Sequence, residues 1–196
     1  MKSPVVAQTE SRRVAVAGAA ADTLGHRLAE TVACSPLRHR ALALGLRDAA
    51  SLLALAVQRG CRHYAGVMPG DATAVREAAT ISDEELVVLL LHGANAFEPF
   101  LIRAAAELLR CRPMGARRLA PAARRERCGR VLAYIARAGR EHDLAGREFW
   151  HELLAALGPQ REVAPGVLPH WTRFVALQGV GRGGQSRGAR WIGAAA

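Results

Sequence analysis

Signals that begin and end helices recur along most of this chain, and they constrain its fold more than any other feature. Ser82-Asp-Glu-Glu85 has the spacing of a capping box and stands directly before an apolar run. Ser35-Pro36 and Glu98-Pro99 place a proline in the first turn of a helix, where it is tolerated. Between such signals, aliphatic residues recur at three- and four-residue steps. The pattern predicts helices over residues 22–33, 37–59, 82–93, 99–109, 121–138 and 144–157, with a further short helix after Asp71.

Glycine and proline predict where these helices end. Gly60, Gly93 and Gly139 follow the last apolar positions of three of them, and Pro113 forbids the continuation of a fourth. Asp143 is a suitable cap for the last helix. The inward faces of the helices define an expected core made of Leu42, Leu46, Leu53, Leu89, Ile102, Leu108, Leu132, Ile135, Phe149 and Leu153.

The composition fits a compact helical fold. Of the 196 residues, 51% are hydrophobic and 22% are charged, which is enough apolar material for one core. Aromatic residues make up only 5%, so aliphatic and alanine side chains must fill that core. We expect a mainly α protein, a compact bundle of about five to seven helices with a short, wing-like C-terminal β-hairpin. The expected divisions are a flexible N-terminal arm (1–21), a helical domain (22–158), and a linker with the hairpin or tail (159–196).

The net charge of +10 favours an anionic partner. Lys2 is the only lysine, so the positive charge is almost entirely arginine. A nucleic acid, an anionic membrane surface or an acidic protein would each be attracted. A GC-rich genome writes the same arginine-, alanine- and glycine-rich composition whatever the function. The position of the charge therefore carries more information than its sum.

A glycine- and arginine-rich stretch, Gly179–Trp191, stands in the C-terminal part of the sequence. It lacks the Gly-Lys-Ser/Thr of a phosphate-binding loop. Two apolar, aromatic-bearing segments flank it, Trp171–Leu177 and Ala189–Ile192, which predicts a hairpin with Arg182 and Arg187 at its tip. Helices followed by a basic hairpin are the arrangement of winged helix-turn-helix proteins, although no motif is specific enough to assign a family.

A second basic cluster lies around the start of the helix predicted over 121–138. Between residues 117 and 130, Glu126 is the only acidic residue among six arginines. The two clusters predict a nucleic-acid-binding protein, such as a bacterial DNA-binding regulator, that contacts phosphates through Arg117, Arg118, Arg124, Arg125, Arg182 and Arg187. The alternative is a protein–protein adaptor, a scaffold of stacked helix pairs that recognises an acidic partner without catalysis.

No motif indicates a catalytic or metal site, so we expect no cofactor and lean against an enzyme. Glu148 and His151 have the Glu-x-x-His spacing of di-iron bundles, but without a second copy they are expected to face solvent. Glu141-His142-Asp143 are adjacent and point apart, whereas a catalytic triad is assembled from distant positions. Cys61-Arg-His63 lacks partners at zinc-binding spacing.

The location of the protein is predicted from its cysteines and its apolar runs. No run approaches the roughly 18 residues of a membrane helix. Arg12-Arg13 before Val14–Ala21 has the form of a twin-arginine export signal, but its apolar stretch is short and weak. We therefore expect a cytoplasmic protein. Wide, irregular spacing also favours buried thiols in a reducing compartment over a disulfide framework for the four cysteines, Cys34, Cys61, Cys111 and Cys128.

Overall fold

The computed structural model describes residues 35–65, 80–95, 98–163, 166–171, 175–180 and 186–191, the last two ranges by their backbone alone. The expected arm (1–21), the helix predicted over 22–33 and the short helix after Asp71 lie outside these residues. Within them the protein is mainly α, as predicted. The seven α-helices are α3 (Pro36–Ala43), α4 (Ala49–Gln58), α5 (Asp83–Leu90), α6 (Pro99–Cys111), α7 (Ala116–Arg125), α8 (Gly129–His142) and α9 (Arg147–Leu157).

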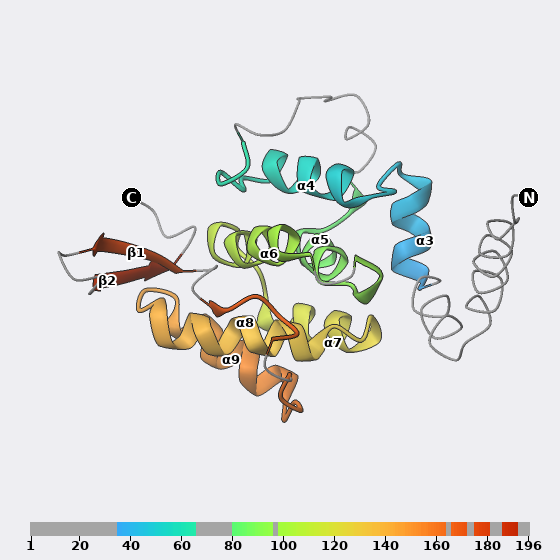
Figure 1. Cartoon of the computed structure of the whole chain (residues 1–196). Coiled ribbons are helices and arrows are strands. Elements are labelled where there is room, and N and C mark those ends of the chain that lie inside the picture. The colour runs from blue at the N-terminus through green and yellow to red at the C-terminus, as the bar shows by residue number, and fades with distance from the viewer. Residues whose placement is uncertain are drawn as a thin grey trace, which may run out of the picture.

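The helices pack in three tiers (Figure 1). The first tier is α4, the second is α5 with α6, and the third is α7 with α8 and α9. The helix α3 lies at one end and contacts α5. Five consecutive residues of α5, from Leu86 to Leu90, are buried because neighbours enclose this helix on several sides. A short 3₁₀ turn, η3 (Gly93–Asn95), follows α5.

The helix start predicted at Ser82 is confirmed. The Ser82 hydroxyl accepts a hydrogen bond from the Glu85 amide at 3.1 Å, and the Glu85 carboxylate accepts one from the Ser82 amide at 3.0 Å. Two otherwise unpaired backbone donors of α5 are satisfied in this way. The start of α6 at Pro99 is also confirmed.

The single helix predicted over residues 37–59 is wrong, because the chain forms two helices there. Gly45 has a φ of +83° and closes α3 in a turn in which the Leu46 amide donates to the Ala41 carbonyl at 2.9 Å. Asp48 and Ser51 then form a capping box that opens α4. Because the apolar spacing continues across the break, the periodicity alone conceals it.

The helix predicted to begin at Pro121 is also wrong in its bounds. Pro121 lies inside α7, which begins at Ala116, and a turn at residues 126–128 separates α7 from α8. In that turn Arg127 has a φ of +56°, and the Cys128 amide donates to the Ala123 carbonyl at 2.9 Å. A helix end with this hydrogen bond usually has glycine at the residue with positive φ. Arginine stands there instead, so the sequence did not indicate that the helix ends.

The predicted helix end at Gly139 and cap at Asp143 are wrong as well. The helix α8 continues to His142, and α9 begins at Arg147 after Gly146. Gly139 is present because Trp150 lies against it: a Cβ at this position would be 2.4 Å from the indole. Asp143 instead accepts hydrogen bonds from the Trp150 indole N–H at 2.8 Å and the Gly146 amide at 3.1 Å.

The predicted core is largely confirmed. Leu42 and Phe149 are only partly buried. The fully buried aromatic residue of α9 is Trp150, next to Phe149. The remaining eight members are buried: Leu46, Leu53, Leu89, Ile102, Leu108, Leu132, Ile135 and Leu153.

Two strands are described in the C-terminal part, β1 (Val175–Val180) and β2 (Ser186–Trp191). They pair antiparallel, with Val175 opposite Trp191 and Val180 opposite Ser186, and β2 contacts α8. Residues 181–185, which would form the tip, lie outside the described residues. The predicted hairpin with a basic tip therefore stays a prediction.

Candidate nucleic-acid interface

Four arginines share the exposed side of α7. Arg117, Arg118, Arg124 and Arg125 are all exposed, while Ala116, Leu119, Ala120, Ala122 and Ala123 are buried. Residues separated by one, seven and eight positions fall on one side of an α-helix, because two turns take about seven residues. The buried side packs against α5 and α9, so the arginines are turned to solvent. We call these four residues the α7 arginine face.

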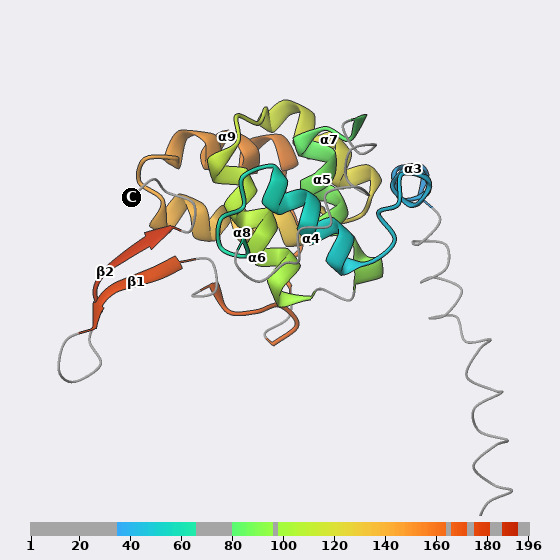
Figure 2. The ribbon, with the colours of Figure 1, turned by 90° about the horizontal axis from the view of Figure 1, so that it is seen from above.

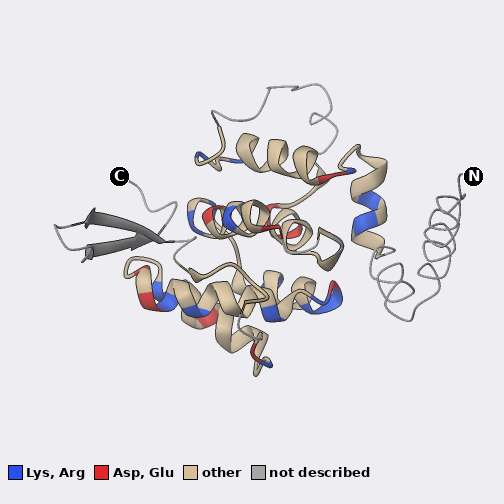
Figure 3. Ribbon diagram, in the orientation of Figure 1, with Lys and Arg blue, Asp and Glu red and all other residues tan. Residues whose placement is uncertain are grey.

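The α7 arginine face is nearly free of opposing charge. Arg117 lies 3.5 Å from Glu152 of α9, but both side chains are largely exposed, and such pairs contribute little. No acidic residue occurs within α7 itself. The adjacent Glu126 is buried and lies 3.7 Å from the imidazole of His92 instead. Figure 3 shows the basic positions along α7.

The two groups of arginines predicted from the sequence are not brought together. Arg182 lies outside the described residues, and Arg187 is in β2, where only the backbone is described. Figures 1 and 2 both place β1 and β2 away from α7, at the other end of α8. The α7 arginine face is therefore a surface by itself.

A segment that the sequence did not single out covers part of α8. The strap, defined here as residues 158–163 and 166–171, runs back along α8 after α9. Arg130 donates to the carbonyls of Arg161 and Glu162, Arg137 donates to that of Gln160, and the Tyr134 hydroxyl donates to that of Pro169 at 3.0 Å. Three side chains of α8 thus hold the strap, which forms no regular helix or strand.

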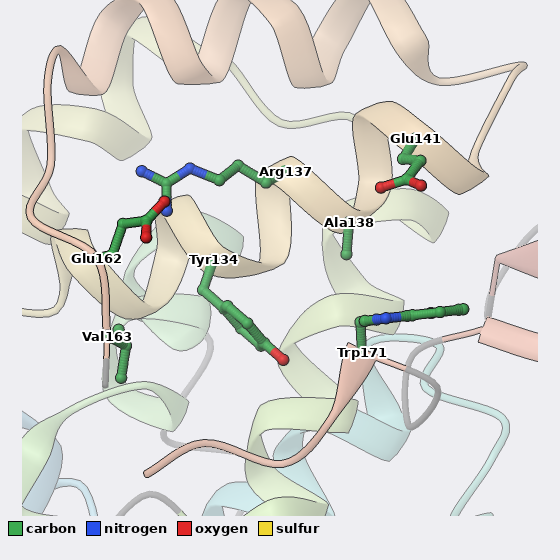
Figure 4. Close-up of a pocket in the computed structure, with 7 residues that line it drawn as sticks. All are labelled: Tyr134, Arg137, Ala138, Glu141, Glu162, Val163 and Trp171. Atoms are coloured by element: carbon green, nitrogen blue, oxygen red, sulfur yellow. The ribbon is translucent and has the colours of Figure 1, made fainter. Parts of the chain in front are cut away.

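A cavity of about 260 Å³ lies between α8 and the strap. Figure 4 shows Tyr134 and Trp171 at its walls, with the charged side chains of Arg137, Glu141 and Glu162 around it. The ring of Trp171 also stacks on His142, with centroids 4.3 Å apart and an interplanar angle of 18°. Sequence reasoning missed this cavity, because its two sides are about thirty residues apart and no spacing links them.

The sequence candidates for catalysis or metal binding lie in different surroundings. Glu148 and His151 are both exposed, so the prediction that they face solvent is confirmed. Asp143 is buried and lies 2.7 Å from the Arg110 guanidinium, while His142 stacks on Trp171. Within the described ranges, no group of three or more metal-ligating side chains occurs.

Cys61 and His63 belong to a turn that a buried carboxylate holds. Glu107 of α6 accepts hydrogen bonds from the Cys61 thiol at 2.9 Å and from the Arg62 amide at 2.7 Å. Burial, together with the neighbouring carboxylate, raises the pKa of the Cys61 thiol far above its ordinary value, so the thiol is unreactive. Cys128 is also buried, but Cys111 is exposed, so the prediction of a buried thiol is wrong there.

Comparison with known proteins adds no relative. No protein-family model, no curated protein and no solved structure matches the chain. Among the described residues, no helix is both long and apolar enough to cross a membrane.

Proposed function

We propose that the protein binds nucleic acid through the α7 arginine face, as a DNA-binding regulator would. The observation that carries the proposal is the set of four exposed arginines on one side of a helix that has no acidic residue. A guanidinium is always charged and can donate two parallel hydrogen bonds to a phosphate, so it suits a polyanionic backbone. In this proposal, Arg182 and Arg187 supply a second set of phosphate contacts.

The distance between the arginines of the α7 arginine face suits the phosphates of duplex DNA. Arg117 and Arg124 are seven residues apart, which is about 10 Å along the helix axis. The major groove of DNA is about 12 Å wide, so the two arginine pairs can reach phosphates on its opposite edges. Arg117 and Arg118 at one end and Arg124 and Arg125 at the other would then act as two anchors.

The absence of large exposed hydrophobic residues on α7 favours nucleic acid over an acidic protein. The centre of a protein–protein interface is usually apolar and rich in aromatic residues. The exposed large hydrophobic residues of the described chain are Leu144 and Val167, and neither belongs to α7. An acidic protein would thus find charge on this surface but no apolar centre.

The test is a titration of labelled duplex DNA at several salt concentrations, read by fluorescence anisotropy. Each phosphate contact contributes about 0.9 to the slope of log affinity against log salt. Replacing all four arginines of the face by alanine should therefore flatten the slope by about 3 to 4 and weaken binding at low salt. Alanine keeps the helix, because it has the highest helix propensity.

A matched control removes the same charge elsewhere. Arg47, Arg62, Arg140 and Arg147 are also exposed, and all four lie outside α7. The fourfold alanine variant of these residues should keep most of the wild-type slope. If both variants lost the same amount of slope and affinity, net charge alone would explain the binding, and the proposal would be contradicted. No DNA binding at low salt, with retained binding of polyglutamate, would favour the acidic-protein adaptor instead.

A further inference from the structure

The cavity between α8 and the strap combines the groups that recognise a nucleobase. Tyr134 and Trp171 offer aromatic rings on which a flat base can stack. The stack on His142 holds the indole of Trp171 in place. At about 260 Å³ the cavity is smaller than the ~300–1,000 Å³ usual for drug-sized ligands, so it suits a single base.

The charged groups of the cavity present both acceptors and donors. In the view of Figure 4, Arg137 and Glu162 lie on one side of the cavity and Glu141 on the other. Arg137 directs one N–H to the Gln160 carbonyl at 3.3 Å, which keeps the guanidinium beside the strap. Its other N–H groups remain available as donors, since a guanidinium carries five. Ionised carboxylates only accept hydrogen bonds.

This combination selects among the bases. Guanine alone has two neighbouring N–H donor groups, N1–H and the N2 amino group, beside the O6 acceptor. A carboxylate can accept from both donors, while a guanidinium donates to O6 and N7. In uracil and thymine the single N3–H lies between two carbonyls, which a carboxylate repels. In adenine and cytosine the amino group stands next to a ring nitrogen that only accepts.

We propose that this cavity binds an unpaired guanine base, with Glu162 accepting from its N1–H and N2 amino groups, Arg137 donating to O6, and Tyr134 and Trp171 stacking on its rings. The choice of a nucleobase as the ligand rests on the proposed nucleic-acid function. The base could belong to a single strand or to a free guanine nucleotide. The two sources share the same chemistry, and the experiment separates them.

The experiment measures binding of GMP, AMP, CMP and UMP to the full-length protein by isothermal titration calorimetry. GMP should bind about tenfold or more tightly than the other three. Loss of one hydrogen bond to a charged group weakens binding by at least about that factor. Glu162→Gln should abolish the preference for GMP, because an amide cannot accept from two donors in the same way. The Glu162 side chain is exposed, so the variant should fold.

Two further variants keep the result interpretable. Glu148→Gln, in an exposed glutamate of α9 outside the cavity, should leave the preference unchanged. Trp171→Phe should weaken GMP and AMP binding together, because it reduces the stacking surface without touching the hydrogen bonds. The proposal would be overturned if Glu148→Gln reduced the GMP preference as much as Glu162→Gln does, or if the preference survived Glu162→Gln.

A second set of titrations uses single-stranded oligothymidine with and without one guanine. If the oligonucleotide with guanine binds more tightly and Glu162→Gln removes this preference, the ligand is a base carried in a strand. A preference confined to GMP identifies a free nucleotide. If neither probe shows a preference that depends on Glu162, the inference fails. Duplex binding through the α7 arginine face is measured independently by its salt slope, so failure of one proposal leaves the other recognisable.

Discussion

At the scale of single residues, three buried carboxylates organise the connections between helices. Glu107 holds the turn after α4, Asp143 joins the end of α8 to Trp150, and Glu126 lies against His92 at the turn between α7 and α8. Their exposed fractions are 4%, 3% and 7%, so each is nearly removed from water. Hydrogen bonds compensate the lost hydration of Glu107 and Asp143.

Gly139 is a residue whose replacement by alanine should be costly, because a large aromatic ring packs against it. A Cβ there would lie 2.4 Å from the Trp150 ring, which is fully buried and has no room to move. We expect Gly139→Ala to lower the free energy of unfolding by about 1–3 kcal/mol, the cost typical of overpacking. Denaturation in urea, followed by circular dichroism, measures the change.

Gly129 is the matched control for Gly139, because it lies on the same helix. A Cβ at Gly129 would meet the amide oxygen of Gln160 at 3.3 Å, the far end of a flexible side chain. Gly129→Ala should therefore be close to neutral, since the gain in helix propensity offsets a small adjustment. Equal destabilisation by both variants would show that the Trp150 contact is not what requires a glycine at position 139.

At the scale of elements, α3, α4 and α5 begin with side-chain caps, and the cap of α5 contains a carboxylate, Glu85, that can be titrated. Burial of the Glu85 carboxylate opposes ionisation, but hydrogen bonds from Ser82 and Arg40 outweigh it, and the pKa of Glu85 falls below its ordinary 4.5. A lowered pKa in the folded state stabilises the fold above the pKa of the unfolded chain. This stabilisation is lost as the pH falls through the folded-state pKa.

We expect Ser82→Ala to cost about 0.5–2 kcal/mol of stability, as loss of an N-cap usually does. Glu85→Gln should lower stability near neutral pH and weaken the decline of stability in acid, because the titrating group is gone. Urea denaturation between pH 3 and 7 measures both effects. Glu148→Gln, at an exposed glutamate in the first turn of α9, serves as the control and should leave the acid decline intact.

At the scale of the whole molecule, the strap and the N-terminal segment should contribute unequally to stability. The strap receives hydrogen bonds from Arg130, Tyr134 and Arg137 and brings Leu168 into the core. We expect a chain lacking residues 159–196 to melt at a clearly lower temperature. Deleting residues 1–21 should leave the melting temperature nearly unchanged, because their weak apolar pattern cannot offset the entropy of ordering. A large loss from the N-terminal deletion would contradict this division.

The sequence by itself determined the features whose physical cause lies within one or two helical turns. The capping box at Ser82, the start of α6 at Pro99 and most of the apolar stripes depend on groups three or four residues apart, so they can be read without the fold. The exposure of the α7 arginine face follows in the same way, although the helix that carries it begins five residues earlier than predicted.

The tertiary structure alone decided the features that join distant parts of the chain. The packing of Trp150 on Gly139, the pairing of Asp143 with Arg110 and the cavity between α8 and the strap are of this kind. These contacts depend on which surfaces meet when the helices pack, and no local spacing records that choice.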